Sequence, residues 1–302
     1  CWLLLVPVAI ALPVAAAADD GGNSAAAYDA AGSSSVGDVD NRAVSAGFPQ
    51  CLTQLLREDE AITMAPVFIG EVFTNARGGI STNNATRYQG LLSIPISVDF
   101  EKAGVPLPGK FHLLAQNTQG EGLTNDYIGD TQVVSNIDPL DNVTQVGEFW
   151  WEFGLLNGGL TFRLGKQDLN SEFLVIDSAT DFINSSFGIS PSAYLPTYPT
   201  QSMAAVVLAK LTDSTTLKYG VWSGFSGRRS WGISRDGVLF HFGELDYAYL
   251  LGGGTLPGSL QIGAAYVPGG KVHQANFSTI FGYYVQVEQL VYREGIGDGS
   301  HV

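Results

Sequence analysis

Side chains of opposite character alternate along two neighbouring segments of this chain, residues 148–153 and 160–165. Because successive side chains of a strand point to opposite faces, the alternation predicts a β-hairpin with one apolar and one polar face. A soluble sandwich would bury the apolar face in a core, whereas a membrane barrel would turn it to lipid and the polar face to a lumen. The apolar face holds Phe149, Trp151, Phe153, Phe162 and Leu164, and the polar face holds Glu148, Trp150, Glu152, Thr161, Arg163 and Gln167.

The same alternation recurs along the chain and predicts ten strands. The connections between them alternate in length, which is typical of outer-membrane barrels with short periplasmic turns and longer extracellular loops. The short connections are 101–108, 154–159, 212–216 and 250–258, and the long ones are 75–87, 120–143, 169–201, 224–238 and 268–280. The strands are expected at 66–73, 88–100, 110–118, 148–153, 160–165, 202–211, 217–223, 239–249, 259–267 and 281–292.

Strand length and aromatic placement also favour a barrel. A strand of ten residues with a rise of ~3.4 Å, tilted by ~45°, spans about 24 Å, close to the ~25 Å apolar band of such barrels. Aromatic side chains gather near the predicted strand ends, as in interfacial girdles. One position conflicts with the pattern: Pro95 lacks a backbone N–H and predicts an edge or a bulge within its strand.

Composition excludes several function classes. The net charge of −14 argues against a nucleic-acid partner, which would require a basic face. Cys1 and Cys51 are the only cysteines, and the four histidines show no metal-ligand spacing, so no metal site or cofactor is expected. Apart from the N-terminal stretch, no apolar run reaches the ~20 residues of a transmembrane helix.

The N-terminal region divides into three parts. Residues 1–18 hold an apolar run followed by four alanines, which predicts the later part of a secretory signal peptide and export from the cytoplasm. Residues 19–47 are rich in Ala, Ser, Gly and Asp, and we expect them to be disordered. Leucines at roughly helical spacing predict a short helix over 48–63, ahead of a barrel domain at 65–302.

Several short runs within this barrel domain carry a family resemblance. They are VSNI at 134–137, EFWWE at 148–152, RLGKQ at 163–167, SEF at 171–173 and FINSSFG at 182–188, together with residues 90–102. Over residues 67–293 the chain resembles the carbohydrate-selective porins of the OprB type. The resemblance implies an antiparallel transmembrane β-barrel of about sixteen strands in the outer membrane, which passes neutral sugars and folds one long loop inward as a constriction.

The chain departs from that family pattern at both ends. Residues 46–56 lack the Gly-Asp-Trp-Gly-Gly run that usually opens the mature region, and Val302 is not the aromatic residue that typically ends such barrels. About ten of the sixteen strands are present. We therefore expect the chain to be a fragment whose residues do not close a barrel by themselves.

The long connection 169–201 is the expected constriction loop. Its many apolar side chains suit packing inside a lumen better than a solvated tip, and long loops of this kind are usually functional or disordered. Sugar hydroxyls suit planar bidentate groups such as guanidinium and carboxylates, while aromatic faces suit sugar C–H surfaces. The candidates are Glu172, Asp177, Asp181 and Asn184 on the loop and Glu148, Trp150, Glu152, Arg163, Gln167 and Trp222 on the lumen face, with Arg163 favoured.

We therefore interpret the chain as a passive sugar channel rather than an enzyme, with neutral mono- or oligosaccharides and outer-membrane lipid as partners. The resemblance leaves open whether barrels associate as a homotrimer. Two alternatives remain: a soluble secreted β-sandwich that binds polysaccharide, and a secreted glycosidase. The glycosidase alternative needs two catalytic carboxyl groups ~5–9.5 Å apart. Glu148 and Glu152 do not meet this requirement, because they lie about 13 Å apart along a strand.

Overall fold

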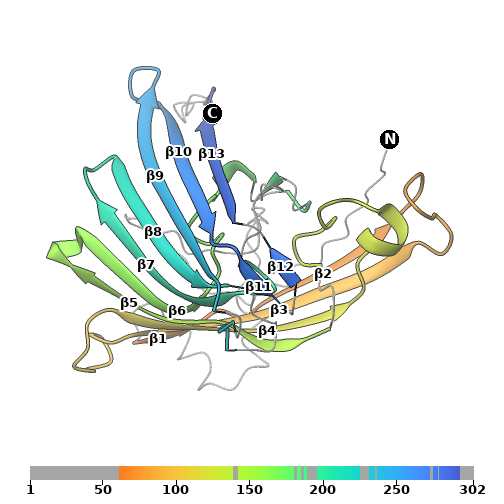
Figure 1. Ribbon diagram of the computed structural model, residues 1–302, viewed down its shortest axis with the longest axis horizontal. Coiled ribbons are helices and arrows are strands. Elements are labelled where there is room, and N and C mark those ends of the chain that lie inside the picture. The colour runs from red at the N-terminus through yellow and green to blue at the C-terminus, as the bar shows by residue number, and fades with distance from the viewer. Residues whose placement is uncertain are drawn as a thin grey trace, which may run out of the picture.

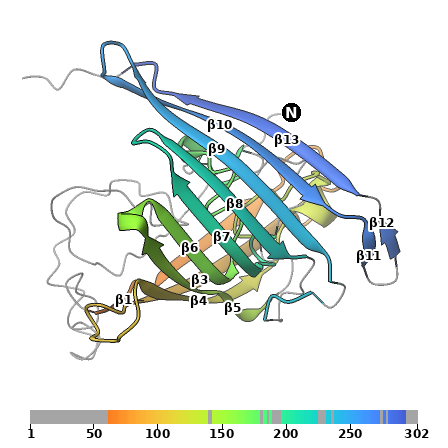
Figure 2. The ribbon, with the colours of Figure 1, turned by 60° about the vertical axis from the view of Figure 1, so that its left-hand side comes forward.

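The computed structural model describes residues 61–138, 142–179, 182–184, 187–188, 196–224, 231–234, 237–272, 275–277 and 279–292. Within these residues, eleven strands form one antiparallel sheet that curves into an open trough (Figure 1). The strand order is β1-β3-β4-β5-β6-β7-β8-β9-β10-β13, with β2 also paired to β3. In Figure 2, β9, β10 and β13 lie at one side of the trough and β3 to β5 at the other.

Ten of the eleven strands correspond closely to the ten that the alternation predicts, and β1 is additional. Their bounds are β1 (Ile62–Met64), β2 (Val67–Thr74), β3 (Thr86–Asp99), β4 (Lys110–Gly120), β5 (Thr144–Leu155), β6 (Leu160–Gln167), β7 (Ser202–Lys210), β8 (Thr215–Ser223), β9 (Leu239–Leu251), β10 (Leu256–Val267) and β13 (Ile280–Gln289). A small separate pair consists of β11 (Gly270–Val272) and β12 (Ala275–Phe277). The predicted alternation of short and long connections is confirmed, and the short ones lie at one end of the sheet.

In the part of the chain that the structure describes, helical structure is confined to single turns. These are η1 (Thr124–Ile128), η2 (Leu156–Gly158) and η3 (Asp177–Ala179). Among the described residues, no helix is long and apolar enough to cross a membrane. The predicted helix over 48–63 lies mostly outside the described residues, but its last part is wrong, because Ile62 and Thr63 begin β1.

A break in the edge strand explains how Pro95 fits inside β3. Met64 pairs with Ile96 and Val67 pairs with Ser93, so β1 and β2 are interrupted opposite Pro95. The missing N–H of Pro95 therefore faces a gap in the ladder, where the carbonyl of Pro95 accepts a hydrogen bond from the N–H of Ala65. This matches the expectation that the proline sits where pairing is interrupted.

The two faces of the sheet differ in the way that a membrane wall requires. The convex face carries large apolar side chains that remain exposed, whereas the concave face buries charged and amide side chains. This is the reverse of a soluble sandwich, which would cover the apolar face with a second sheet. The exposed convex residues include Leu164, Leu217, Tyr219, Leu245, Tyr247, Ile262, Val285 and Val287, and the buried concave ones include Gln89, Gln116, Lys218 and Glu244.

A small apolar core joins the connection between β6 and β7 to the concave face. Leu169, Phe173 and Leu174 of this connection are buried, and the ring of Phe173 lies edge-on to Trp222 and Phe242, each 5.4 Å away. The remaining buried members of the cluster are Val206, Val238, Phe240 and Val267. The first part of this connection therefore packs against the inside of the curved sheet, as its apolar composition predicts.

Candidate functional site

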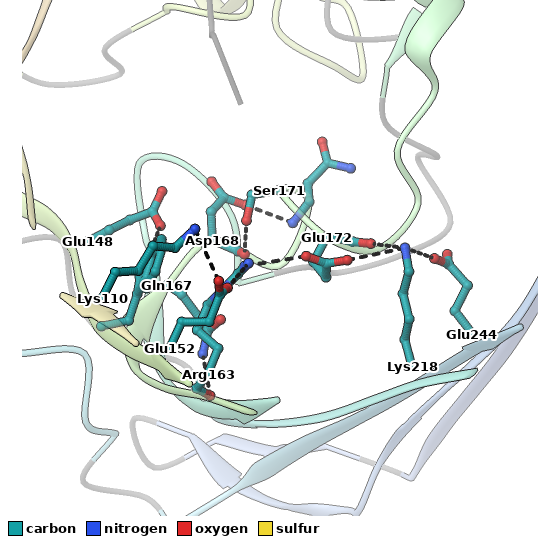
Figure 3. A network of polar contacts seen from close by, with 12 residues as sticks. Lys110, Glu148, Glu152, Arg163, Gln167, Asp168, Ser171, Glu172, Lys218 and Glu244 are labelled. Carbon is teal, nitrogen blue, oxygen red and sulfur yellow. Dashed lines mark hydrogen bonds and ion pairs between the residues drawn. The ribbon is translucent and has the colours of Figure 1, made fainter. Parts of the chain in front are cut away.

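A row of alternating charges crosses the concave face from β4 to β9 (Figure 3). We call it the charged belt, and it consists of Lys110, Glu152, Arg163, Glu172, Lys218, Glu244 and Asp246. All but Glu172 stand on strands. Glu172 belongs to the connection between β6 and β7, so a loop residue links the two halves of the belt.

The first half of the belt follows directly from strand register. Lys110, Glu152 and Arg163 are direct cross-strand neighbours on β4, β5 and β6, where opposite charges stabilise pairing. Lys110 Nζ lies 3.1 Å from Glu152 Oε1, while Arg163 donates from Nε and Nη2 to Glu152 Oε2 at 2.9 and 2.6 Å. Arg163 Nη1 also lies 3.4 Å from Glu172 Oε2. The guanidinium is thus fixed between a wall carboxylate and a loop carboxylate.

An aromatic side chain supports this arginine. The guanidinium carbon of Arg163 lies 4.6 Å from the ring centroid of Trp150, a cation–π distance. On β4, the neighbouring strand on the other side of β5, the His112 ring stacks on Trp150 at 4.7 Å with an interplanar angle of 22°. The indole Nε1–H donates to Glu148 Oε2 at 3.0 Å. Trp150 is thus held between two partners and orients Arg163.

The second half of the belt gathers carboxylates around one lysine. Lys218 Nζ lies 3.3 Å from Glu172 Oε1, 3.2 Å from Glu244 Oε1 and 2.6 Å from Asp246 Oδ2. The phenol of Tyr284 on β13 donates to the other oxygen of Glu244, which is fully buried. Three carboxylates against one ammonium make this half acidic, whereas the first half, with two cations beside Glu152, is basic.

Two glycines leave the space that these contacts need. Gly165 on β6 has φ +141°, and a Cβ there would collide with the backbone of Phe149 and Trp150 on β5. The close approach of β5 and β6 beside Arg163 therefore depends on the glycine. On β10, a Cβ at Gly263 would collide with the ring of Tyr284, which crosses this position to reach Glu244.

One carboxylate, that of Asp168, links the two ends of the connection between β6 and β7 through hydrogen bonds. Asp168 Oδ1 accepts the N–H of Asn170 at 2.8 Å, and Oδ2 accepts the N–H of Tyr198 at 2.7 Å. The N–H of Leu169 donates to the carbonyl of Pro196 at 3.2 Å and adds a second tie. Burial raises the pKa of the Asp168 carboxyl, an effect opposed by hydrogen bonds from Thr197, Tyr198 and Asn170. The connection is thus closed at its base.

The structure brings together four of the ten candidate residues that the sequence indicates: Arg163, Glu152, Glu172 and Trp150. Glu148 lies beside them, bonded to Trp150. Trp222 and Gln167 differ from expectation, because they are buried, with exposed fractions of 0% and 1%. Trp222 is covered by Phe173, so its ring does not line the concave surface. Asp177 and Asn184 also lie on the connection, where the N–H of Asp177 donates to Glu288 on β13, and Asp181 lies outside the described residues.

Sequence reasoning missed four members of the site: Lys110, Lys218, Glu244 and Asp246. The signal was present, since each occupies a polar position in an alternating strand, and Lys110 appears in the predicted third strand. Cross-strand register, which the alternation does not specify, decides that they meet. Within the described residues no group of three or more His, Cys, Asp or Glu side chains could hold a metal ion.

Chemically, the belt offers donors and acceptors at fixed positions on a water-facing wall. Arg163, Glu152, Glu172 and Lys218 remain partly accessible, with side chains 14%, 17%, 18% and 11% exposed. Groups held in place by their neighbours can exchange hydrogen bonds with a hydroxylated solute without large movements.

Comparisons with known proteins agree with this architecture. The model of the "Carbohydrate-selective porin, OprB family" matches residues 83–297. A solved structure, described as the high pH structure of Pseudomonas putida OprB, superimposes with a TM-score of 0.66 at 19% identity and covers 78% of this chain. The chain spans 63% of the length of that solved chain. A comparison with curated proteins gave no match. The chain belongs to the OprB family of carbohydrate-selective porins.

Proposed function

We propose that the chain forms the wall of an outer-membrane channel through which neutral sugars diffuse down their concentration gradient. The observation that carries this proposal is the fixed charged belt on the concave face, opposite an exposed apolar convex face. A belt of paired charges binds uncharged hydroxyl groups weakly, because each new hydrogen bond to a hydroxyl replaces an existing contact between two belt side chains. Weak binding suits passive flux, since a solute must enter readily and also leave.

Within this channel, the connection 169–201 narrows the pore and Arg163 is the main sugar-facing group. Support for the narrowing comes from the packing of Leu169, Phe173 and Leu174 on the concave face, which holds the loop inside the trough. Support for Arg163 comes from its planar fork, held by Glu152 and Glu172 and backed by Trp150. The acidic side chains of the belt, beside Arg163 on the same wall, accept hydrogen bonds from sugar hydroxyls.

Neutral mono- or oligosaccharides are the proposed cargo and outer-membrane lipid is the proposed surrounding of the convex face. Export through a signal peptide at 1–18 belongs to the same proposal. Transport rather than catalysis belongs to the same proposal, and it is supported by the belt carboxylates, which serve as partners of Arg163 and Lys218. Association of the barrels into a homotrimer would occupy part of the convex face without changing the pore.

The test is sugar-dependent block of ion current through the full-length protein in planar lipid bilayers. Glucose and maltose should reduce the current in a saturable way, while a short polyethylene glycol of similar mass should lower it only by its effect on bulk conductivity. Equal, non-saturating effects of the sugars and the polymer would contradict carbohydrate selectivity. Absence of any conductance would contradict the channel itself.

A further inference from the structure

One stretch of the connection between β6 and β7 is bound to the wall through its main chain. Between Glu172 and Ser178, five backbone groups contact side chains of the concave face, and none of these contacts depends on the side chains of the loop. Four wall residues supply them: Lys218, Glu244, Gln286 and Glu288. We call residues 172–178 the docked segment.

The contacts follow the segment in chain order. Lys218 Nζ donates to the carbonyl of Glu172 at 2.7 Å, and the N–H of Leu174 donates to Glu244 Oε2 at 2.9 Å. Gln286 Nε2 then donates to the carbonyl of Val175 at 2.6 Å. The wall residues come from β8, β9 and β13 in that order, so the segment crosses the strands while wall side chains hold successive peptide groups.

The end of the docked segment depends on a single carboxylate. Glu288 on β13 accepts the N–H of Asp177 at 3.2 Å through Oε1 and the N–H of Ser178 at 2.8 Å through Oε2. These two N–H groups open the single helical turn η3, whose first amides have no partner inside the turn. A residue 110 positions away in the sequence thus supplies the cap of this turn.

A second contact fixes the neighbouring wall residue. Gln286 Nε2 also donates to Gln261 Oε1 on β10 at 2.6 Å, which orients the amide toward Val175. Glu244 is fixed in the same way, because the Tyr284 phenol and the Lys218 ammonium both bind it. The wall side of the contact is therefore ordered before the loop binds, which reduces the entropic cost of docking.

From these contacts we propose that Glu288, with Gln286, is a positioning residue that sets where the loop lies in the pore. This deepens the proposed function and rests on it, because the loop position then decides the width of the sugar path. The apolar core around Phe173 anchors the loop as far as Leu174, and Asn136 holds it again at the carbonyls of Phe182 and Ile183. Between these points the wall clamp holds Val175 to Ser178, so loss of Glu288 loosens this stretch while both anchors remain.

The experiment compares Glu288→Gln and Glu288→Ala with the unaltered full-length protein. Both hydrogen bonds to the Glu288 carboxylate are exposed to solvent, so their combined loss should change the docked population roughly 10- to 100-fold. Amide hydrogen exchange at Asp177 and Ser178 should accelerate by this factor, while exchange at Leu169 and Phe173 stays unchanged. Single-channel current noise should rise in parallel, and Glu288→Asp should restore part of the protection because it keeps a carboxylate.

Glu121→Gln is the matched control, since Glu121 is 74% exposed, pairs with Arg87 and does not contact the docked segment. Wild-type exchange rates and noise in both Glu288 variants would overturn the proposal, as would equal acceleration along the whole loop. If Glu288→Ala fails to insert, Gln286→Ala tests the same clamp at Val175. Should the unaltered protein show no block by sugar, the proposed function fails, whereas the exchange rates and ion-current noise still decide the role of Glu288.

Discussion

Replacement of Arg163 by Ala tests the chemistry of the charged belt most sharply. The change removes three polar contacts, two to Glu152 and one to Glu172, together with the cation–π contact to Trp150. Both carboxylates keep a lysine, because Lys110 lies 3.1 Å from Glu152 and Lys218 lies 3.3 Å from Glu172. The loss of folding free energy should therefore stay below the roughly 3–5 kcal/mol that accompanies a buried charge left alone.

The effect on sugar should be larger than the effect on the fold. A hydrogen bond from a charged donor contributes about 1.5–3 kcal/mol, so the sugar concentration that half-blocks the ion current should rise roughly 10- to 100-fold. The belt also loses one positive charge, which should shift the reversal potential under a salt gradient toward cation selectivity. Both quantities are measured on the same bilayer, with block at several glucose concentrations and the reversal potential without sugar.

Two further variants separate the shape of the arginine from its charge. Arg163→Lys keeps the charge but loses the planar fork, so it should weaken sugar block while leaving ion selectivity near that of the unaltered protein. Arg87→Ala is the control, because Arg87 pairs with Glu121 and Tyr127 outside the belt. Unaltered half-block concentrations in both Arg163 variants would refute the assignment of this residue to the sugar path.

Two predictions concern the packing that holds the site. Gly165→Ala should destabilise the β5–β6 pairing by about 1–3 kcal/mol or more, because the position has φ +141° and lies against the Trp150 backbone. The midpoint of urea unfolding in detergent measures this loss. Gly282→Ala is the control and should be nearly neutral, because no atom lies within 4 Å of a Cβ at that position. Trp222→Ala should cost about 3–5 kcal/mol by leaving a cavity beneath Phe173, whereas Trp231→Ala, with Trp231 72% exposed, should cost far less. Equal midpoints within either pair would contradict the packing described.

The fold was largely predictable because a strand has a fixed side-chain period. The alternation in residues 148–153 and 160–165 assigned Glu152 and Arg163 to one face and Trp151 and Leu164 to the other, and the pairing confirms both. The helical prediction over 48–63 was wrong at Ile62 because a short edge strand of three residues contains too few positions to show a period. Intrinsic strand propensity cannot determine the conformation of so short an element, whereas pairing with β3 does.

The site was less predictable because it depends on what meets across strands. The sequence placed Trp222 on the concave face, yet Phe173 of the loop covers it, and no periodicity tells where a loop comes to lie. Lys218 and Glu172 are 46 positions apart, and their contact requires the strand register and the loop path together. Glu288 lies on the concave side of β13, but its partners, the amides of Asp177 and Ser178, carry no sequence signal.

The central claim is that the concave face meets water and the convex face meets lipid. Ser93 and Ile94 are neighbours in the middle of β3 and point to opposite faces, with Ser93 beside Gln116 on the concave side. Single cysteines at these positions, in a protein whose Cys1 and Cys51 are replaced by Ser, can be treated in proteoliposomes with a charged, water-soluble thiol reagent. The account predicts rapid modification of Ser93→Cys and protection of Ile94→Cys; rapid modification of Ile94→Cys with protection of Ser93→Cys would contradict it.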